Sequence, residues 1–207
     1  MYQNGYFEAN VLFRVTSIGV MSDSAVGAGT DAAQLSGPGD TIREILRYVP
    51  DGTSMPQEMW SGRHRNILLL VVAQVPFLLA LGLYEGTESV ITGATVPAIP
   101  LTTVLLELGL VAGLAVASLL PWFPRRVRTA LATVGFLSTS VLLVHFSGGF
   151  IEAHFHFFVG MAVVAVYEDW VPFALGIGYV VLTHGVFGMI NPERVYNHTA
   201  AINNPWV

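Results

Sequence analysis

The chain has 207 residues, of which 53% are hydrophobic and only 11% are charged, and its mean hydropathy is +0.61. Soluble domains usually carry about 25% charged residues, so this composition indicates a membrane protein. The absence of cysteine excludes disulfides, thiolate metal sites and iron–sulfur clusters, and a net charge of −5 without a basic run argues against a nucleic-acid partner.

The N-terminal part of the chain differs in composition from the rest. Its first residues do not resemble a signal peptide, because they lack a basic start and Glu8 interrupts any apolar core. Met21 is a candidate for the true start of translation. Residues 21–39 are small and polar and cannot bury enough apolar surface to fold. We therefore expect residues 1–39 to form a disordered tail.

Residues 40–62 predict a short amphipathic helix followed by a connector. Apolar residues with the spacing of one helix face precede Pro50, namely Ile42, Ile45, Leu46 and Val49. We expect this helix to lie on the membrane surface or against the bundle. The connector holds two prolines and two glycines, which are typical of irregular structure.

Long apolar stretches dominate residues 63–207 and predict membrane-spanning helices of about 20 residues each. The predicted spans are residues 66–84, 100–120, 129–146, 153–168 and 171–190. The expected fold class is therefore all-α: a polytopic transmembrane helical bundle of about five spans with a disordered N-terminal tail. A bundle of this kind has the lipid bilayer as its first partner.

Arginines between the predicted spans orient the bundle. Arg63 and Arg65 precede the first span, and residues 125–128 hold three arginines between the second and third spans. Because cytoplasmic loops are enriched in basic residues, this pattern predicts a multi-pass protein of the cell membrane with a cytoplasmic N-terminus. The loop at 147–152 then lies on the extracytoplasmic side.

Histidines gather on that predicted extracytoplasmic side, around the sequence His145 to Phe158. Ionisable groups are costly in lipid, so they are expected to face a protein interior or a water-filled pocket. We take six residues as candidates for binding a ligand: His145, Glu152, His154, His156, His184 and His198. Glu107, an acid within the second predicted span, is a supporting candidate that either pairs with one of these histidines or is protonated and bonded to a hydroxyl such as Thr103.

Two interpretations of this cluster are consistent with the sequence: a metal or haem site, and a polar network. Helical spacing puts His154 and His156 on different faces, whereas Glu152 and His156 share a face at i and i+4. Nitrogen and oxygen ligands without thiolates suit ions such as Zn, Cu or Fe, or a haem held by two histidines. The metal-binding candidates are His145, His154, His156 and His184. The alternative is a proton-sensing or purely structural polar network between helices.

Several motifs together resemble a known family. They are Arg63-His64-Arg65, the stretch from Val144 to Phe158, Tyr167-Glu168-Asp169-Trp170-Val171-Pro172, Thr183-His184-Gly185-Val186 and Val195-Tyr196-Asn197-His198. This pattern, over roughly residues 50–207, is similar to the N-terminal membrane sensor module of archaeal and bacterial methyl-accepting chemotaxis transducers, histidine kinases and diguanylate cyclases. The resemblance adds Tyr167, Asp169 and Trp170 as supporting residues.

The chain departs from that family in two places. The family often has a histidine pair where this chain has Thr183-His184, which weakens any site that needs both imidazoles. The module normally continues into a sixth span and a cytoplasmic output domain, so the resemblance implies a truncated module. Such a module would act as a homo-oligomer or with a partner signalling subunit.

We therefore expect a sensory input module of a chemotaxis-type signal transducer and not an enzyme. Its extracytoplasmic histidine and glutamate cluster would bind a ligand, a metal, haem or protons. The rival hypothesis is a membrane metalloenzyme, a histidine-ligated oxidoreductase, whose ligands usually lie near the cytoplasmic interface. A transporter would be expected to show an internal repeat with broken helices, and the sequence has no convincing repeat.

Overall fold

A computed structural model of the chain describes residues 42–44, 47–52, 54–84, 98–190, 192 and 195–203. The predicted disordered tail, residues 1–39, lies outside this described part. Within it, residues 42–44 and 47–48 are helical where the amphipathic helix was predicted, although residues 45 and 46 between them are not described.

The described residues are almost entirely helical, which confirms the predicted all-α class. The main helices are α2 (Gln57–Gly82), α3 (Leu101–Leu119), α4 (Arg125–Phe146), α5 (Ile151–Ala165) and α6 (Trp170–Val180). A π-helical turn, η1 (Val181–Val186), and α7 (Phe187–Ile190) continue α6, and α8 (Thr199–Asn203) follows. The one isolated β-bridge in the described part joins Asp51 to Asp169.

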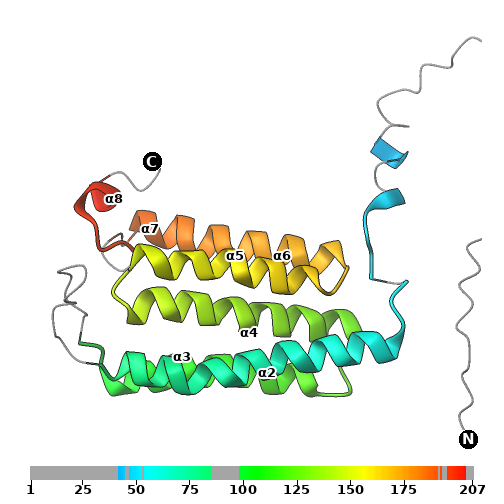
Figure 1. The fold of residues 1–207 in the computed structure, drawn as a ribbon, viewed down its shortest axis with the longest axis horizontal. Helices are drawn as coiled ribbons and strands as arrows, with labels where there is room; N and C mark the ends of the chain where they lie inside the picture. The colour runs from blue at the N-terminus through cyan, green and yellow to red at the C-terminus, as the bar shows by residue number, and fades with distance from the viewer. Residues whose placement is uncertain are drawn as a thin grey trace, which may run out of the picture. The chain divides into compact units, whose positions relative to one another are not determined.

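Helix α4 is the centre of the bundle. It contacts α2, α3, α5 and α6, with α2 and α3 on one side and α5 and α6 on the other (Figure 1). Its own buried side chains include Phe136, Leu137 and Phe146. Every other long helix therefore packs on α4 as a common neighbour.

Four helical segments are long and apolar enough to cross a membrane: Gln57–Gly82, Leu101–Leu119, Arg125–Phe146 and Trp170–Ile190. Helix α5 has 15 residues, about 22 Å at 1.5 Å per residue, which is shorter than the roughly 30 Å hydrocarbon core. It nevertheless runs alongside α4 from the end of that helix to the start of α6 (Figure 1). The fourth predicted span, residues 153–168, is thus a helix below full spanning length, whereas the fifth, residues 171–190, lies in a segment long enough to span.

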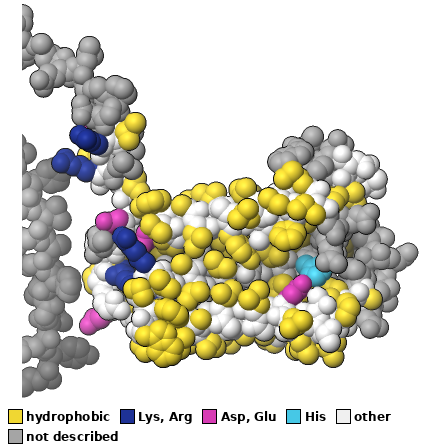
Figure 2. Space-filling model, turned by 180° about the vertical axis from the view of Figure 1, so that it is seen from behind, with side chains coloured by type: hydrophobic (Ala, Val, Ile, Leu, Met, Phe, Trp, Pro, Cys, Tyr) yellow, Lys and Arg dark blue, Asp and Glu magenta, His cyan; other side chains and the backbone are white. Residues whose placement is uncertain are grey.

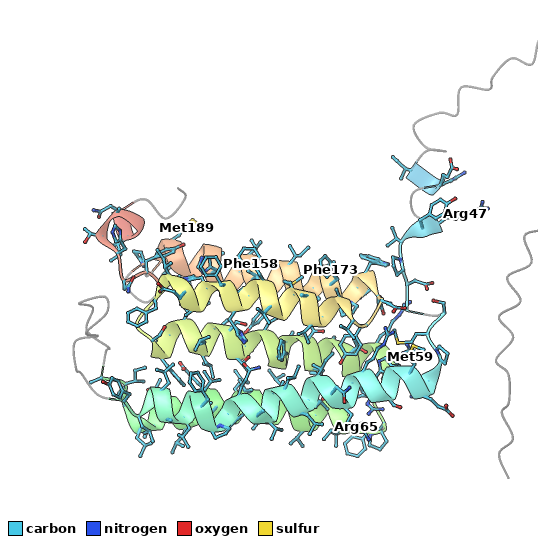
Figure 3. The ribbon with its side chains drawn as sticks, in the orientation of Figure 1. Arg47, Met59, Arg65, Phe158, Phe173 and Met189 are labelled. Carbon is cyan, nitrogen blue, oxygen red and sulfur yellow. The ribbon has the colours of Figure 1, made fainter. Side chains whose placement is uncertain are left out.

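The outer surface of the bundle is apolar, as a lipid-facing surface requires. Large hydrophobic side chains such as Leu106 and Ile190 are more than 70% exposed, and hydrophobic side chains cover most of the helical face in Figure 2. Phe158, Phe173 and Met189 lie on the side of the α5–α7 layer that faces away from α4 (Figure 3). This exposure is costly in water and favourable in a bilayer.

Close packing of α5 on α4 depends on one glycine. A Cβ atom added at Gly160 would lie 2.7 Å from the Leu137 Cδ2 atom, and Leu137 is fully buried. Real Cβ atoms essentially never come so close to another atom, so a side chain at residue 160 would force Leu137 or the helix itself to shift. This contact holds α5, which carries two of the candidate histidines, against α4.

Candidate functional site

One end of the bundle holds a paired histidine and carboxylate. His145, in the last turn of α4, lies with its Nδ1 atom 3.0 Å from the Glu107 Oε2 atom of α3. Their side chains are 22% and 31% exposed. Figure 2 shows a histidine and an acidic side chain together at one end of an otherwise apolar face. Glu107 therefore has a histidine partner, one of the two arrangements that the sequence left open.

Three aromatic rings meet beside this pair. The His154 ring of α5 lies 4.7 Å from the His184 ring, centroid to centroid, in an edge-to-face arrangement. The Tyr196 ring is parallel to the His154 ring at 5.9 Å, and its hydroxyl lies 3.4 Å from the His184 Nε2 atom. Burial raises the pKa of Tyr196. His184 reaches the group from the π-helical turn η1, a feature that is frequent at functional sites.

His156 does not join these rings. Its Nδ1 atom lies 2.7 Å from the Ser140 hydroxyl of α4, and its ring lies 6.1 Å from the Phe136 ring. Glu152 is exposed at the start of α5. His198 is also exposed, and its Nδ1 atom accepts a hydrogen bond from the Ala200 N–H. The structure thus brings together His145, Glu107, His154 and His184 and leaves these three apart.

No group of three or more metal-ligating side chains is arranged to hold a metal ion within the part of the chain that the structure describes. Several ring nitrogens already have partners: His145 on Glu107, His154 on the Phe150 carbonyl and His156 on Ser140. A metal would have to replace these contacts, so the geometry does not support the predicted metal site.

Two cavities adjoin the candidate residues. One of about 200 Å³ is lined by Glu107, His145, Thr183 and His184 among apolar neighbours. The other, of about 240 Å³, is lined by His154 and His184 and six apolar side chains. Both are smaller than the roughly 300–1,000 Å³ pockets of drug-sized ligands. Neither cavity is large enough for a haem macrocycle.

The opposite end of the bundle carries a second polar network, which sequence reasoning missed. His64 is 2% exposed, and its Nε2 atom lies 3.1 Å from the Ser118 carbonyl, to which it donates. Its Nδ1 atom therefore accepts from the Tyr167 hydroxyl at 2.8 Å. Arg128 Nε donates to the same Ser118 carbonyl at 2.8 Å. One imidazole thus joins α2, the end of α3 and the turn between α5 and α6.

Trp60 completes this network. Its ring is stacked on His64 at 4.7 Å, and its indole N–H donates to the Thr129 hydroxyl at 3.0 Å. The Arg125 and Arg128 guanidinium groups lie 5.4 and 4.9 Å from the ring centroid, within cation–π distance. Burial raises the pKa of Tyr167, so its phenol stays protonated and able to donate to His64.

The supporting residues taken from the resemblance belong to this second network. Tyr167 contacts His64, and the Asp169 carboxylate caps α6 by accepting from the Val171 N–H at 2.9 Å. The Trp170 N–H donates to the Pro50 carbonyl at 2.8 Å, beside the bridge between Asp51 and Asp169. Tyr167, Asp169 and Trp170 therefore hold the segment that precedes α2 and do not line the histidine end.

Gly52 allows the chain to pass close to Asp169, next to the bridge between Asp51 and Asp169. Its φ is +72°, which favours glycine, and a Cβ atom there would lie 2.8 Å from the Asp169 Oδ2 atom. Arg125 donates to the Met55 carbonyl at 2.9 Å, and Arg63 pairs with Glu168 at 2.7 Å. The segment leading into α2 is thus held at several points on the α5–α6 turn and α4.

Comparison with known proteins gives one informative match. The transducer protein Htr8 of Halobacterium salinarum is 60% identical to this chain over 187 residues. This chain resembles a halobacterial transducer. The match covers 90% of the chain but 29% of the relative, so the chain spans less than a third of that protein's length. No protein-family model and no solved structure matches.

The match to Htr8 confirms the transducer part of the resemblance found in the sequence. It says nothing of histidine kinases or diguanylate cyclases, whose likeness rests on the motifs alone. The apolar helices fit a membrane-embedded region of such a transducer, and they support a multi-pass membrane protein.

Proposed function

We propose that this chain is the membrane-embedded input module of a chemotaxis-type signal transducer. The proposal is carried by the 60% identity with Htr8 over 90% of the chain. A bundle with a polar group at each end suits this role. The end with Glu107, His145, His154 and His184 receives the stimulus, and the end with His64 and Tyr167 passes it on.

The proposed mechanism is a change between two packings of the bundle. A small ligand or a proton that prefers one packing shifts the population toward it, by no more than its difference in affinity. Helix α5 connects the two ends, because it carries His154 near its start and is followed by Tyr167 at the turn. A movement of α5 against α4 would therefore alter how the α5–α6 turn holds residues 50–55.

A chimera tests this function. We expect the chain, placed in Htr8 in exchange for the matching 187 residues, to support the transducer's output in cells lacking the native protein. Glu107→Gln removes the charge that faces His145, so it should shift the stimulus that gives half-maximal output by about 5- to 150-fold, the usual range of allosteric coupling. The measurement is output as a function of stimulus dose, with ligand and pH varied separately.

Phe155→Leu is the matched control, because Phe155 is 62% exposed on the same end of the bundle. It should leave the dose dependence unchanged. A chimera that is present in the membrane and gives no output at any stimulus would refute the input role. An unchanged dose dependence in Glu107→Gln would remove Glu107 and His145 from the sensing site.

The orientation follows from the arginines. Basic side chains gather at the end of the bundle away from the paired histidine and acid (Figure 2), and Arg63, Arg125 and Arg128 make contacts there. We propose that this end is cytoplasmic and the histidine end extracytoplasmic.

The absence of native cysteine allows a direct labelling test of orientation. Ile151 is 55% exposed at the histidine end, so Ile151→Cys should react with a membrane-impermeant maleimide in whole cells. Met59→Cys, which is 48% exposed near the arginine end, should react only after the membrane is opened. The reverse pattern would contradict the orientation and would favour the alternative, an oxidoreductase with its histidines at the cytoplasmic interface.

Partners are part of the proposal. Helix α3 presents Gly109 and Gly113, four residues apart, and a Cβ atom at either would meet nothing within 4 Å. Small residues at this spacing allow close approach of helices in membranes. We propose that this face meets a second copy or a partner signalling subunit.

A further inference from the structure

A contact between Phe157 and His184 separates the two cavities at the histidine end. Their ring centroids are 5.8 Å apart, and both residues line both cavities. The cavity of about 240 Å³ lies between α5 and the segment formed by α6 and η1, and its remaining lining includes Phe158, Met161 and Val181. We call this cavity the α5–η1 groove.

The groove faces the surface that the bilayer covers. Phe158 is 73% exposed and Val181 is 59% exposed, and both belong to segments whose outer side is apolar. A molecule that enters here comes from the hydrocarbon phase and must itself be largely apolar. A volume of about 240 Å³ exceeds that of the engineered cavity of roughly 150 Å³ that binds benzene. The groove therefore has room for a small aromatic or branched molecule.

His154, which lines the groove, has one polar atom without a hydrogen-bond partner among the described residues. The His154 Nδ1 atom lies 2.8 Å from the Phe150 carbonyl, and a carbonyl only accepts, so Nδ1 carries the proton. In the neutral ring, Nε2 is then an acceptor. This Nε2 atom is buried and has no hydrogen-bond partner among the described residues. Buried polar atoms are nearly always paired, so His154 calls for a hydrogen-bond donor.

We propose that the α5–η1 groove binds a lipid-soluble alcohol or phenol whose hydroxyl donates to the His154 Nε2 atom. Because Nε2 is buried, the His154 ring or a neighbouring side chain must shift as the hydroxyl binds. The Tyr196 ring, parallel to the His154 ring at 5.9 Å, belongs to the segment after α7 rather than to a spanning helix. The ligand's apolar body lies between Phe158, Met161 and Val181. This inference deepens the proposed function: that the bound alcohol or phenol acts as a stimulus rests on the chain being an input module.

His184 connects the groove with the second cavity, because it lines both. His184 contacts His154 at 4.7 Å, contacts Tyr196, and faces the second cavity beside Glu107 and His145. A hydroxyl bound to His154 would change the position of the His184 ring and hence the wall of the second cavity. Occupation of the groove thus alters the environment of the His145–Glu107 pair without touching it.

Phenol and toluene provide a matched pair of probes, because they differ in one hydroxyl in place of one methyl. The full chain is placed in nanodiscs, and saturable binding is measured after subtraction of partitioning into nanodiscs without protein. We expect phenol to bind about tenfold more tightly than toluene, the worth of one buried hydrogen bond of about 1.4 kcal/mol. In His154→Phe the ratio should fall to about one. Equal affinities in the native protein, or a preference for phenol that persists in His154→Phe, would overturn the proposal.

A second measurement does not depend on the folding of the variant. In the native protein with ¹⁵N-labelled histidine, phenol should move the His154 Nε2 resonance with a saturable dependence on concentration, and toluene should not. A resonance that phenol leaves in place would overturn the site. If phenol binds as expected but the chimera with Htr8 gives no output, the proposed function fails and the groove stands; the opposite result rejects the groove and keeps the function.

Discussion

His64→Ala is expected to destabilise the bundle by about 3 kcal/mol, because it removes a buried ring and leaves the buried Tyr167 hydroxyl without its acceptor. His64 is 2% exposed, and its Nδ1 atom accepts a hydrogen bond from the Tyr167 hydroxyl. Tyr167 is itself only 1% exposed. Without the imidazole, the Tyr167 hydroxyl loses its acceptor at a site that water does not reach. The Trp60 ring also loses the neighbour stacked on it at 4.7 Å. The free energy of unfolding in mixed micelles of dodecyl sulfate and a mild detergent, followed by circular dichroism, measures the loss.

Tyr167→Phe isolates the hydrogen bond from the packing. It keeps the ring and should cost about 1 kcal/mol, the net worth of one hydrogen bond. The double variant should cost less than the sum of the two single losses, since both remove the same bond. His198→Ala is the matched control, because His198 is exposed, and it should change stability by less than about 0.5 kcal/mol. A loss in His64→Ala no larger than in this control would show that the network does not stabilise the bundle.

The position of His64 explains why the sequence did not reveal it. Arg63-His64-Arg65 precedes the first apolar run, so the sequence indicates a charged flank that orients the protein and one motif of the resemblance, but no buried contact for His64. The structure instead begins α2 at Gln57, nine residues before the predicted start of that span. Polar residues extend this helix because they find partners on other elements, and hydropathy alone contains no information on such partners.

The histidine end shows the same division between what can and cannot be predicted. Helical periodicity predicts different faces for His154 and His156, and the structure gives the two rings different partners. An ionisable carboxyl group in an apolar run is expected to need a partner, and Glu107 contacts His145. Tyr196 could not be predicted to contact His154, because the path of the chain after α7 determines that contact. The π-helical turn at His184 was also not predicted, since the apolar pattern of residues 171–190 continues through it.

Tyr167, Asp169 and Trp170 illustrate a further limit. The family resemblance added them as supporting residues, yet the 15 residues of helix α5 separate them from the histidine end. A helix of that length spans about 22 Å. The resemblance therefore grouped with the histidine site three residues that lie at the opposite end of the bundle.

Gly160→Leu is expected to disrupt the contact between α5 and α4 and to cost about 3 kcal/mol or more, the upper part of the range for overpacked cores. The first carbon of the new side chain would already lie 2.7 Å from the Leu137 Cδ2 atom, and Ser140 Oγ lies at 3.6 Å. Leu137 is completely buried, so rotation of its side chain would displace other side chains packed around it. Helix α5 must move away from α4, which lengthens the 2.7 Å contact between Ser140 and His156. Unfolding in mixed micelles measures the stability, and the His156 ring resonances report the displacement.

Gly178→Leu is the matched control, since a Cβ atom at Gly178 would meet nothing within 4 Å and the same residue type is exchanged in a neighbouring helix. Leucine favours helix over glycine by somewhat less than 1 kcal/mol, so this variant should be neutral or slightly more stable. The contrast between the two glycines separates steric overlap at the α4–α5 contact from a general effect of leucine in these helices. If Gly160→Leu were as stable as Gly178→Leu, α5 would not be packed closely on α4. A movement of α5 could then not connect the histidine end with the turn at Tyr167, and the proposed route of the signal would be lost.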